Sequence, residues 1–177
     1  MERVTRILAT TSEICLKGGN RGWFERTLGE NVRRALADLR PTRVERSAAQ
    51  VMVRFEGPVP FDEVARRLGT VFGLDTIQPV ADGGATLASL LERVDALVAG
   101  LPSASFAVRC RRSDKGFPSS SPEIERAVGE RVAQTTGWPV DLKRPRRTVR
   151  VLVERRRLWV WLHRVQGPGG LPVGVGG

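Results

Sequence analysis

Cysteine and histidine are scarce in this sequence: Cys15, Cys110 and His163 are the only three such residues among 177. The two cysteines lie far apart and neither belongs to a C-x-x-C pair, which argues against a disulfide scaffold or a zinc site and favours a reducing compartment. No apolar run approaches the roughly 20 residues that a membrane span needs. The first residues lack the apolar core of a secretory signal. These absences predict a soluble, cytoplasmic chain.

Nucleotide-binding motifs are also missing. The sequence has no G-x-x-x-x-G-K-[ST] loop and no G-x-G-x-x-G between a predicted strand and helix. Scattered carboxylates such as Glu13 and Glu25 form no pattern typical of acid–base catalysis, and His163 has no nucleophile or ligand cluster near it in sequence. We therefore predict no catalytic residue and no metal ligand in this chain.

Positive charge is abundant. The 29 basic residues exceed the 19 acidic ones, for a net charge of +10, and all but Lys17, Lys115 and Lys143 are arginine. The arginine guanidinium presents a planar fork of donors that fits phosphate oxygens. A phosphate-rich partner, either nucleic acid or an anionic surface, is the first hypothesis. Arginine usage inherited from a GC-rich genome is the alternative.

Hydrophobic periodicity predicts two α+β domains. In the first, segments with strand and helix periodicity follow the order βαββαβ, which is typical of a ferredoxin-like fold. They lie at residues 3–9, 24–39, 42–47, 50–55, 62–68 and 72–80. After Gly83-Gly84, the predicted elements are a helix capped by Thr86, a strand over 105–112, a helix beginning at Ser121-Pro122-Glu123, and a hairpin over 148–153 and 158–163.

Three groups of cations are candidate anion sites. The first lies in a glycine-rich turn before a helix, where free backbone N–H groups suit a phosphate. The second lies at the end of the 105–112 strand, and the third surrounds Pro145. The candidate binding residues are Lys17, Asn20 and Arg21; Arg109, Arg111, Arg112 and Lys115; and Lys143, Arg144 and Arg146. An ordinary loop, a solvated strand face and a nuclear-localisation run are the respective alternatives. Arg155 to Arg157 form a further cationic run, for which the alternative is a charged hairpin tip with no binding role.

Several of these residues lie in motifs that resemble a known family. Residues 13–25, EICLKGGNRGWFE, resemble the E-x-x-L-K-G-x-N-R-x-x-F-E signature at the front of tRNA 4-thiouridine synthetases, the ThiI family of tRNA sulfurtransferases. Residues 71–74, VFGL, resemble its V-F-G-I segment, and residues 106–118, FAVRCRRSDKGFP, resemble the F-x-V-R-x-x-R-S-D-K-x-F-P stretch of its THUMP domain. Residues 46–50 depart from the G-R-I-like turn expected there.

The resemblance implies a ferredoxin-like domain over residues 1–82, an α/β THUMP domain over 85–166, and a Gly/Pro-rich linker over 167–177. The two domains together are expected to bind the acceptor end of tRNA. In the family, which also serves thiamine biosynthesis, a following ATP-pyrophosphatase domain with an S-G-G-x-D-S loop forms the 4-thiouridine. This sequence contains no such loop, so ATP and Mg²⁺ are implied only for that domain and no cofactor is expected here.

Two functions stay open. The chain is either the tRNA-binding module for thiouridylation by an ATP-pyrophosphatase domain or subunit, or a free-standing THUMP adaptor that presents tRNA to a different modifying enzyme. A third class, a protein that binds membrane surfaces or polyanions, would bind anionic vesicles and heparin as well as tRNA. A homodimer is compatible with either of the first two functions, and no membrane partner is expected.

Overall fold

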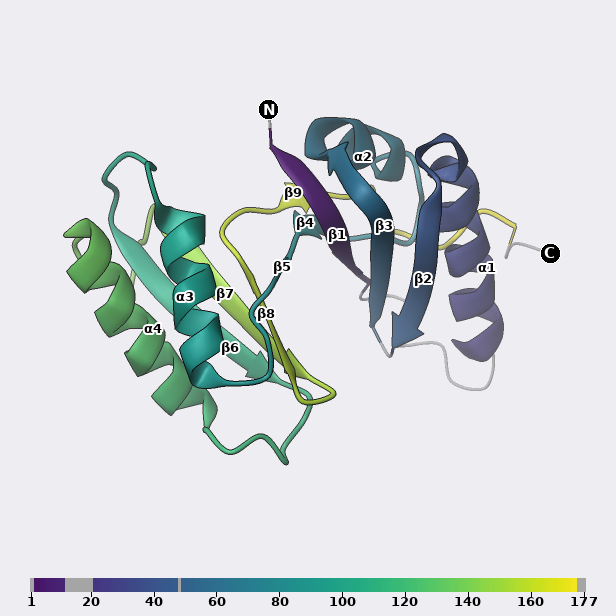
Figure 1. The fold of residues 1–177 in the computed structure, drawn as a ribbon. Coiled ribbons are helices and arrows are strands. Elements are labelled where there is room, and N and C mark those ends of the chain that lie inside the picture. Colours follow the sequence, from purple (N-terminus) through teal and green to yellow (C-terminus); the bar gives the residue numbers. More distant parts are fainter. Residues whose placement is uncertain (1, 12–20, 48, 175–177) are drawn as a thin grey trace. The chain divides into compact units, whose positions relative to one another are not determined.

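The computed structural model describes residues 2–11, 21–47 and 49–174, and it divides into two compact units (Figure 1). The first unit comprises Met1–Pro79 together with Arg164–Gly177, and the second comprises Val80–His163. The sequence placed the domain boundary three residues later and assigned residues 164–166 to the second domain. Over the described residues, no helix combines the length and apolar character that a bilayer crossing requires.

The first unit has the predicted βαββαβ order and gains one further strand. Its elements are β1 (Arg3–Thr10), α1 (Arg21–Ala35), the 3₁₀ helix η2 (Ala37–Leu39), β2 (Pro41–Ser47), β3 (Gln50–Pro60), α2 (Phe61–Leu68), β4 (Thr76–Pro79) and β9 (Val165–Gln166). All neighbouring strands pair antiparallel in the order β2-β3-β1-β4-β9. The ferredoxin-like prediction is confirmed. The extended segment predicted from residue 72 is shorter, because β4 begins at Thr76.

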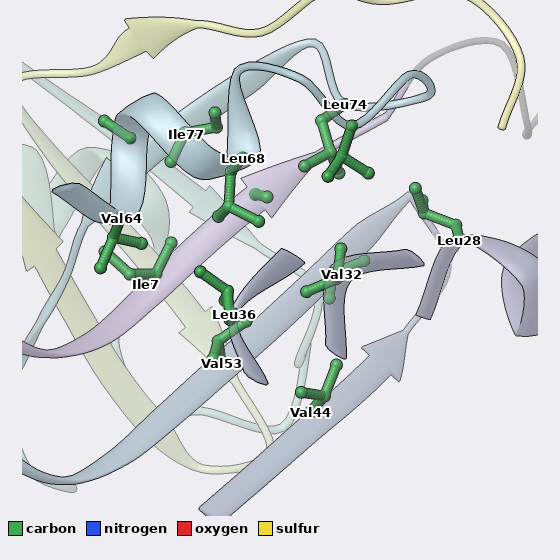
Figure 2. Close-up of a cluster of buried hydrophobic side chains, with 14 of the residues drawn as sticks. Ile7, Leu28, Val32, Leu36, Val44, Val53, Val64, Leu68, Leu74 and Ile77 are labelled. Carbon is green, nitrogen blue, oxygen red and sulfur yellow. The ribbon is translucent and has the colours of Figure 1, made fainter. Parts of the chain in front are cut away.

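One hydrophobic core holds the helices of the first unit on its sheet (Figure 2). Leu28 and Val32 lie four residues apart on one face of α1, Leu36 follows directly after its last residue, and each of the three is at most 1% exposed. They meet Ile7 and Val53 from the central strands, which are fully buried. Each such aliphatic side chain contributes roughly 1.5–3 kcal/mol when fully buried.

The C-terminal segment returns to the first unit instead of forming a free linker. Its backbone pairs with β4 and then with the loop before it: Gly167 N donates to Asp75 O at 2.8 Å, and Gly73 N donates to Gly169 O at 2.7 Å. A Cβ at Gly167 would lie 2.2 Å from the carbonyl oxygen of Leu74, so only glycine permits this approach. The start of the predicted Gly/Pro-rich linker thus packs against the first unit, and Gly167 permits its closest approach.

The second unit is a four-stranded sheet covered on one face by two helices. Its elements are β5 (Ala81–Asp82), α3 (Leu87–Val98), β6 (Phe106–Arg112), α4 (Ser121–Thr136), β7 (Arg147–Glu154) and β8 (Arg157–Trp161). The strand order is β5-β8-β7-β6, with β6 and β7 parallel and the other pairs antiparallel. Figure 1 shows α3 and α4 on the same face, over a second hydrophobic core.

Side-chain caps fix the helix starts in this unit. Thr86 caps α3 as predicted, with its hydroxyl accepting from Ser89 N at 3.2 Å. The cap of α4 is Ser120, one residue before the predicted Ser121. Ser120 Oγ accepts from Glu123 N, while the Glu123 carboxylate accepts from Ser120 N at 2.6 Å. This reciprocal pair requires a spacing of three residues, which selects Ser120.

Candidate nucleic-acid interface

Strand β6 forms one edge of the second sheet and carries three of the predicted cations, Arg109, Arg111 and Arg112. Phe106 and Val108 face the helices and are buried, whereas Arg109 and Arg111 are exposed. Cys110 lies on the helix side, where burial raises the pKa of its thiol above the ordinary value. The alternation of strand side chains therefore directs two guanidinium groups away from the core.

Arg109 joins the second predicted cation group to the third. Its Nη2 donates to the carbonyl oxygen of Leu142 at 2.9 Å, 33 residues further along the chain. The loop that begins there is ordered by Asp141, whose Oδ1 accepts from Lys143 N at 3.0 Å and from Arg144 N at 2.9 Å. Arg146 N donates to Ser105 Oγ at 3.2 Å, at the start of β6. Both groups therefore lie along the same edge strand.

Arg112 has a different environment from its neighbours. Its Nη2 donates to the carbonyl oxygens of Lys115 at 2.8 Å and Phe117 at 3.0 Å, and its Nε lies 3.4 Å from the carbonyl oxygen of Asp114. The guanidinium thus organises the loop between β6 and α4. The exposed Lys115 side chain extends from this loop.

The start of α4 follows the same loop and is already capped. The hydrogen bond from Ser120 N holds the pKa of Glu123 below its ordinary value, so this carboxylate is ionised at neutral pH. An anionic side chain at the positive end of a helix is stabilising for the helix. It also occupies the helix end at which an external anion would bind. The side chains of β6 and its loops, and not the helix terminus, are therefore the candidate anion contacts.

Six exposed cations share this edge, and we call them the basic strip. None of the six forms an ion pair with a carboxylate of the described residues 2–11, 21–47 and 49–174, although other exposed arginines do. Unpaired guanidinium and ammonium groups on one strand edge suit a polyanion. The basic strip consists of Arg109, Arg111, Lys115, Lys143, Arg144 and Arg146.

Comparison with known proteins agrees with this two-unit architecture. Residues 6–77 match the model of the ThiI ferredoxin-like domain, and residues 85–162 match that of the THUMP domain. The chain belongs to the ThiI family, of which it carries the ferredoxin-like and THUMP domains. The resemblance drawn from the motifs is confirmed.

Relatives match nearly all of this chain and extend beyond it. The probable tRNA sulfurtransferase of Nocardia farcinica is 40% identical over 97% of the chain, and that of Moorella thermoacetica is 36% identical over 98%. The chain spans 43% and 44% of their respective lengths.

Solved structures share the fold. PH1313 from Pyrococcus horikoshii superposes with a TM-score of 0.86 at 27% identity, over 97% of this chain and 58% of that one. A 4-thiouridine synthetase in complex with RNA and ATP superposes with a TM-score of 0.81 at 22% identity, over 97% of this chain and 44% of that one.

The first predicted cation group is only partly visible. Lys17 and Asn20 lie outside the described residues. Arg21 is the first residue of α1, and its Nε bonds Glu25 Oε1 at 2.8 Å. This ion pair partly neutralises the guanidinium of Arg21.

Asp114 is a residue of the THUMP domain whose role the sequence did not indicate. Its Oδ1 accepts from Gly116 N at 2.9 Å, and its Oδ2 accepts from Arg156 N at 2.8 Å. It therefore ties the β6–α4 loop to the β7–β8 turn, 42 residues away. The local bond follows the Asx-turn pattern of an aspartate two residues before a glycine, a signal present in the sequence. The bond to the distant turn has no local signal.

Proposed function

We propose that this chain is a tRNA-binding module that recognises the acceptor end of tRNA for 4-thiouridine formation by an ATP-pyrophosphatase domain not present in this sequence. The observation that carries the proposal is the match of 97% of the chain, at 40% identity, to a protein named as a tRNA sulfurtransferase. The RNA in the complex of a structurally similar 4-thiouridine synthetase supports it.

The basic strip gives the proposal a physical basis. A cation that already pairs with a carboxylate must break that pair to bind a phosphate, whereas the six cations of the strip have no such pair to break in the described structure. Neutralising phosphates releases counterions from the nucleic acid, so binding depends steeply on salt. Among the described residues, the large aromatic side chains that are exposed, Trp23 and Phe72, lie in the ferredoxin-like domain and not on the strip. This favours recognition of backbone and shape over base stacking by the strip.

Fluorescence anisotropy with labelled RNA tests the proposal. We expect binding to whole tRNA and to an acceptor-stem minihelix, and weaker binding to a DNA duplex of the same length. Log affinity should fall with log salt by roughly 0.7–0.9 per phosphate contact. Equal affinity for tRNA, the DNA duplex and heparin would reject specific tRNA recognition and leave a general polyanion binder.

The catalytic partner is tested by reconstitution. We propose that ATP and Mg²⁺ bind only to the ATP-pyrophosphatase domain. That domain is either part of a longer chain or a separate subunit, and the reaction takes place in the cytoplasm. With ATP, a sulfur donor and tRNA, this chain alone should yield no thiolated nucleoside. Adding an ATP-pyrophosphatase domain from a relative should restore 4-thiouridine. If a different modifying enzyme is stimulated instead, the chain is a THUMP adaptor. Light scattering would show whether it forms a homodimer.

A further inference from the structure

The turn between β7 and β8 is also basic, but its residues are not part of the basic strip. Glu154 and Arg157 form the last pair of the ladder, so Arg155 and Arg156 alone make a two-residue loop. Both have positive φ, at 50° and 59°. Two consecutive left-handed residues define the type I′ hairpin turn, which strongly favours asparagine followed by glycine.

Arginine at both positions works against the stability of this turn. A side chain with a Cβ is disfavoured in the left-handed region, and glycine removes that penalty. The local conformation therefore gives no reason for two arginines at this position. Both side chains are exposed and cationic, so they are accessible to an anionic partner.

The turn lies beside the loop that carries Lys115 of the basic strip. Asp114 accepts from Arg156 N at 2.8 Å, and Ser113 N donates to the carbonyl oxygen of Val153 at 2.9 Å, where β7 approaches the turn. Two hydrogen bonds thus join the loop after β6 to this hairpin, one at the turn and one at the end of β7. Arg157, the next residue, is directed to Asp82, with Nη2 and Oδ2 2.6 Å apart. Its charge is already paired within the domain.

We propose that the β7–β8 turn is a second phosphate-contacting element of the tRNA interface, with Arg155 and Arg156 as the contacts and Asp114 as the residue that positions the turn. This inference rests on the proposed tRNA binding. It extends the interface from the edge of β6 to the adjacent end of β7 and β8. The ligand chemistry is the RNA phosphate backbone, because guanidinium groups form charge-assisted hydrogen bonds with phosphate oxygens, and contacts to phosphates position the nucleic acid without reading its bases.

A stabilising variant separates binding from folding. Arg155→Asn together with Arg156→Gly installs the favoured turn sequence, and we expect its melting temperature to rise by about 4–8 °C. We also expect tRNA binding about tenfold weaker or more, with the salt slope reduced by about 1.4–1.8 for two lost contacts. A less stable variant would contradict the turn assignment.

Two control variants test whether the charge of the turn causes the change in salt slope. Arg155→Lys together with Arg156→Lys keeps both charges, so it should keep the wild-type salt slope. Arg93→Ala removes one charge from α3, which packs against β5 and β8 at the opposite edge of the sheet, and should change the slope little. If the Asn–Gly variant binds tRNA with the wild-type slope, the turn is not part of the interface. If wild-type protein fails to bind tRNA, the proposed function itself fails.

Asp114→Asn tests the positioning role. Removing a negative charge near the RNA should by electrostatics alone strengthen binding. Asparagine replaces one of the two carboxylate oxygens by an NH2 donor, so it cannot accept from Gly116 N at one position and from Arg156 N at the other. We therefore expect binding several-fold weaker, and a smaller effect of the same change in the Asn–Gly turn background. Stronger binding, or an equal loss in both backgrounds, would overturn the role of Asp114.

Discussion

Helix α2 of the ferredoxin-like domain and the basic strip of the THUMP domain both display exposed cations, but they partner them differently. On α2, Arg66 and Arg67 bond Glu63 at 2.8 and 2.6 Å, and Arg67 also bonds Asp38 at 3.1 Å. On the strip, Arg109 bonds a backbone carbonyl of the adjacent loop instead. A carboxylate neutralises a cation, whereas a carbonyl oxygen orients it and leaves its charge available.

This difference bears on how a binding surface is found in a basic protein. Residues 1–80 hold 13 basic and 10 acidic groups, and residues 81–177 hold 16 and 9, so both parts are cationic. Net charge alone therefore marks both domains. The pairing of individual side chains distinguishes a solvated salt-bridge cluster from a surface that can neutralise phosphates.

The largest expected effect comes from Arg112, which supports the strip without belonging to it. Arg112→Ala removes the bonds to the carbonyl oxygens of the β6–α4 loop. We expect the free energy of unfolding to fall by about 1–3 kcal/mol and tRNA binding to weaken more than tenfold. Urea denaturation and anisotropy measure the two effects. The neighbouring Arg111→Ala should weaken binding while leaving stability within about 0.5 kcal/mol. If Arg112→Ala and Arg111→Ala have the same free energy of unfolding, Arg112 does not stabilise the β6–α4 loop.

A matched pair of single-charge changes tests the comparison directly. Lys115→Ala should weaken tRNA binding about tenfold, the size expected for one charged hydrogen bond of about 1.5 kcal/mol. Arg66→Ala removes the same charge from a paired position and should change affinity less than twofold. Both are measured at one fixed salt concentration. Equal losses would mean diffuse attraction to the whole protein, and the strip would not be a site.

Arg131 tests whether ion pairing, and not the domain in which a cation lies, decides whether that cation contributes to tRNA binding. Arg131 of α4 donates from both Nε and Nη2 to Asp95 of α3. Arg131→Ala should lower the free energy of unfolding only slightly, since solvent screens this exposed ion pair, and leave tRNA affinity unchanged. The hydrogen bond from Arg131 lowers the pKa of Asp95. This stabilisation is therefore full above the unfolded pKa of about 3.9 and disappears as pH falls through the lower folded value. A loss of tRNA binding in this variant would contradict the assignment.

The smallest expected effect follows from releasing the paired cations of α2. Hydrogen bonds from Arg66 and Arg67 lower the pKa of Glu63 from 4.5 to about 2. Glu63→Gln removes this carboxylate, and tRNA affinity should rise by no more than about twofold, because α2 lies outside the proposed interface. A large rise would show that pairing alone keeps α2 from binding RNA.

The same variant has a defined dependence on pH. A carboxyl group whose folded pKa is lowered contributes stability above its unfolded pKa and loses it as pH falls through the folded value. The difference in melting temperature between wild type and Glu63→Gln should therefore be constant above about pH 5 and shrink toward pH 2. A difference that does not change over this range would mean that Glu63 has no lowered pKa.

Local patterns in the sequence were sufficient for most of the fold. The spacing of Leu28 and Val32 predicted α1, and the alternation of Phe106 and Val108 with arginines predicted β6, because side-chain direction follows backbone periodicity. The cap at Thr86 and the turn at Arg155 and Arg156 are also short-range features. The family motifs, which are contiguous stretches, led to the ThiI resemblance that the comparisons confirmed.

Contacts between distant segments needed the tertiary structure. Arg109 reaches Leu142, Asp114 reaches Arg156, and the segment after Val165 pairs with β4. Each joins residues separated by more than 30 positions, so no repeat or local motif encodes it. The sequence alone determined which residues are cationic and which faces are buried. The pairs of Arg66 and Arg67 with Glu63 are local, at helical spacing. The fold decided the remaining partners of the cations, such as Asp95 for Arg131 and Leu142 for Arg109, because only folding brings a distant carboxylate or carbonyl within hydrogen-bonding distance.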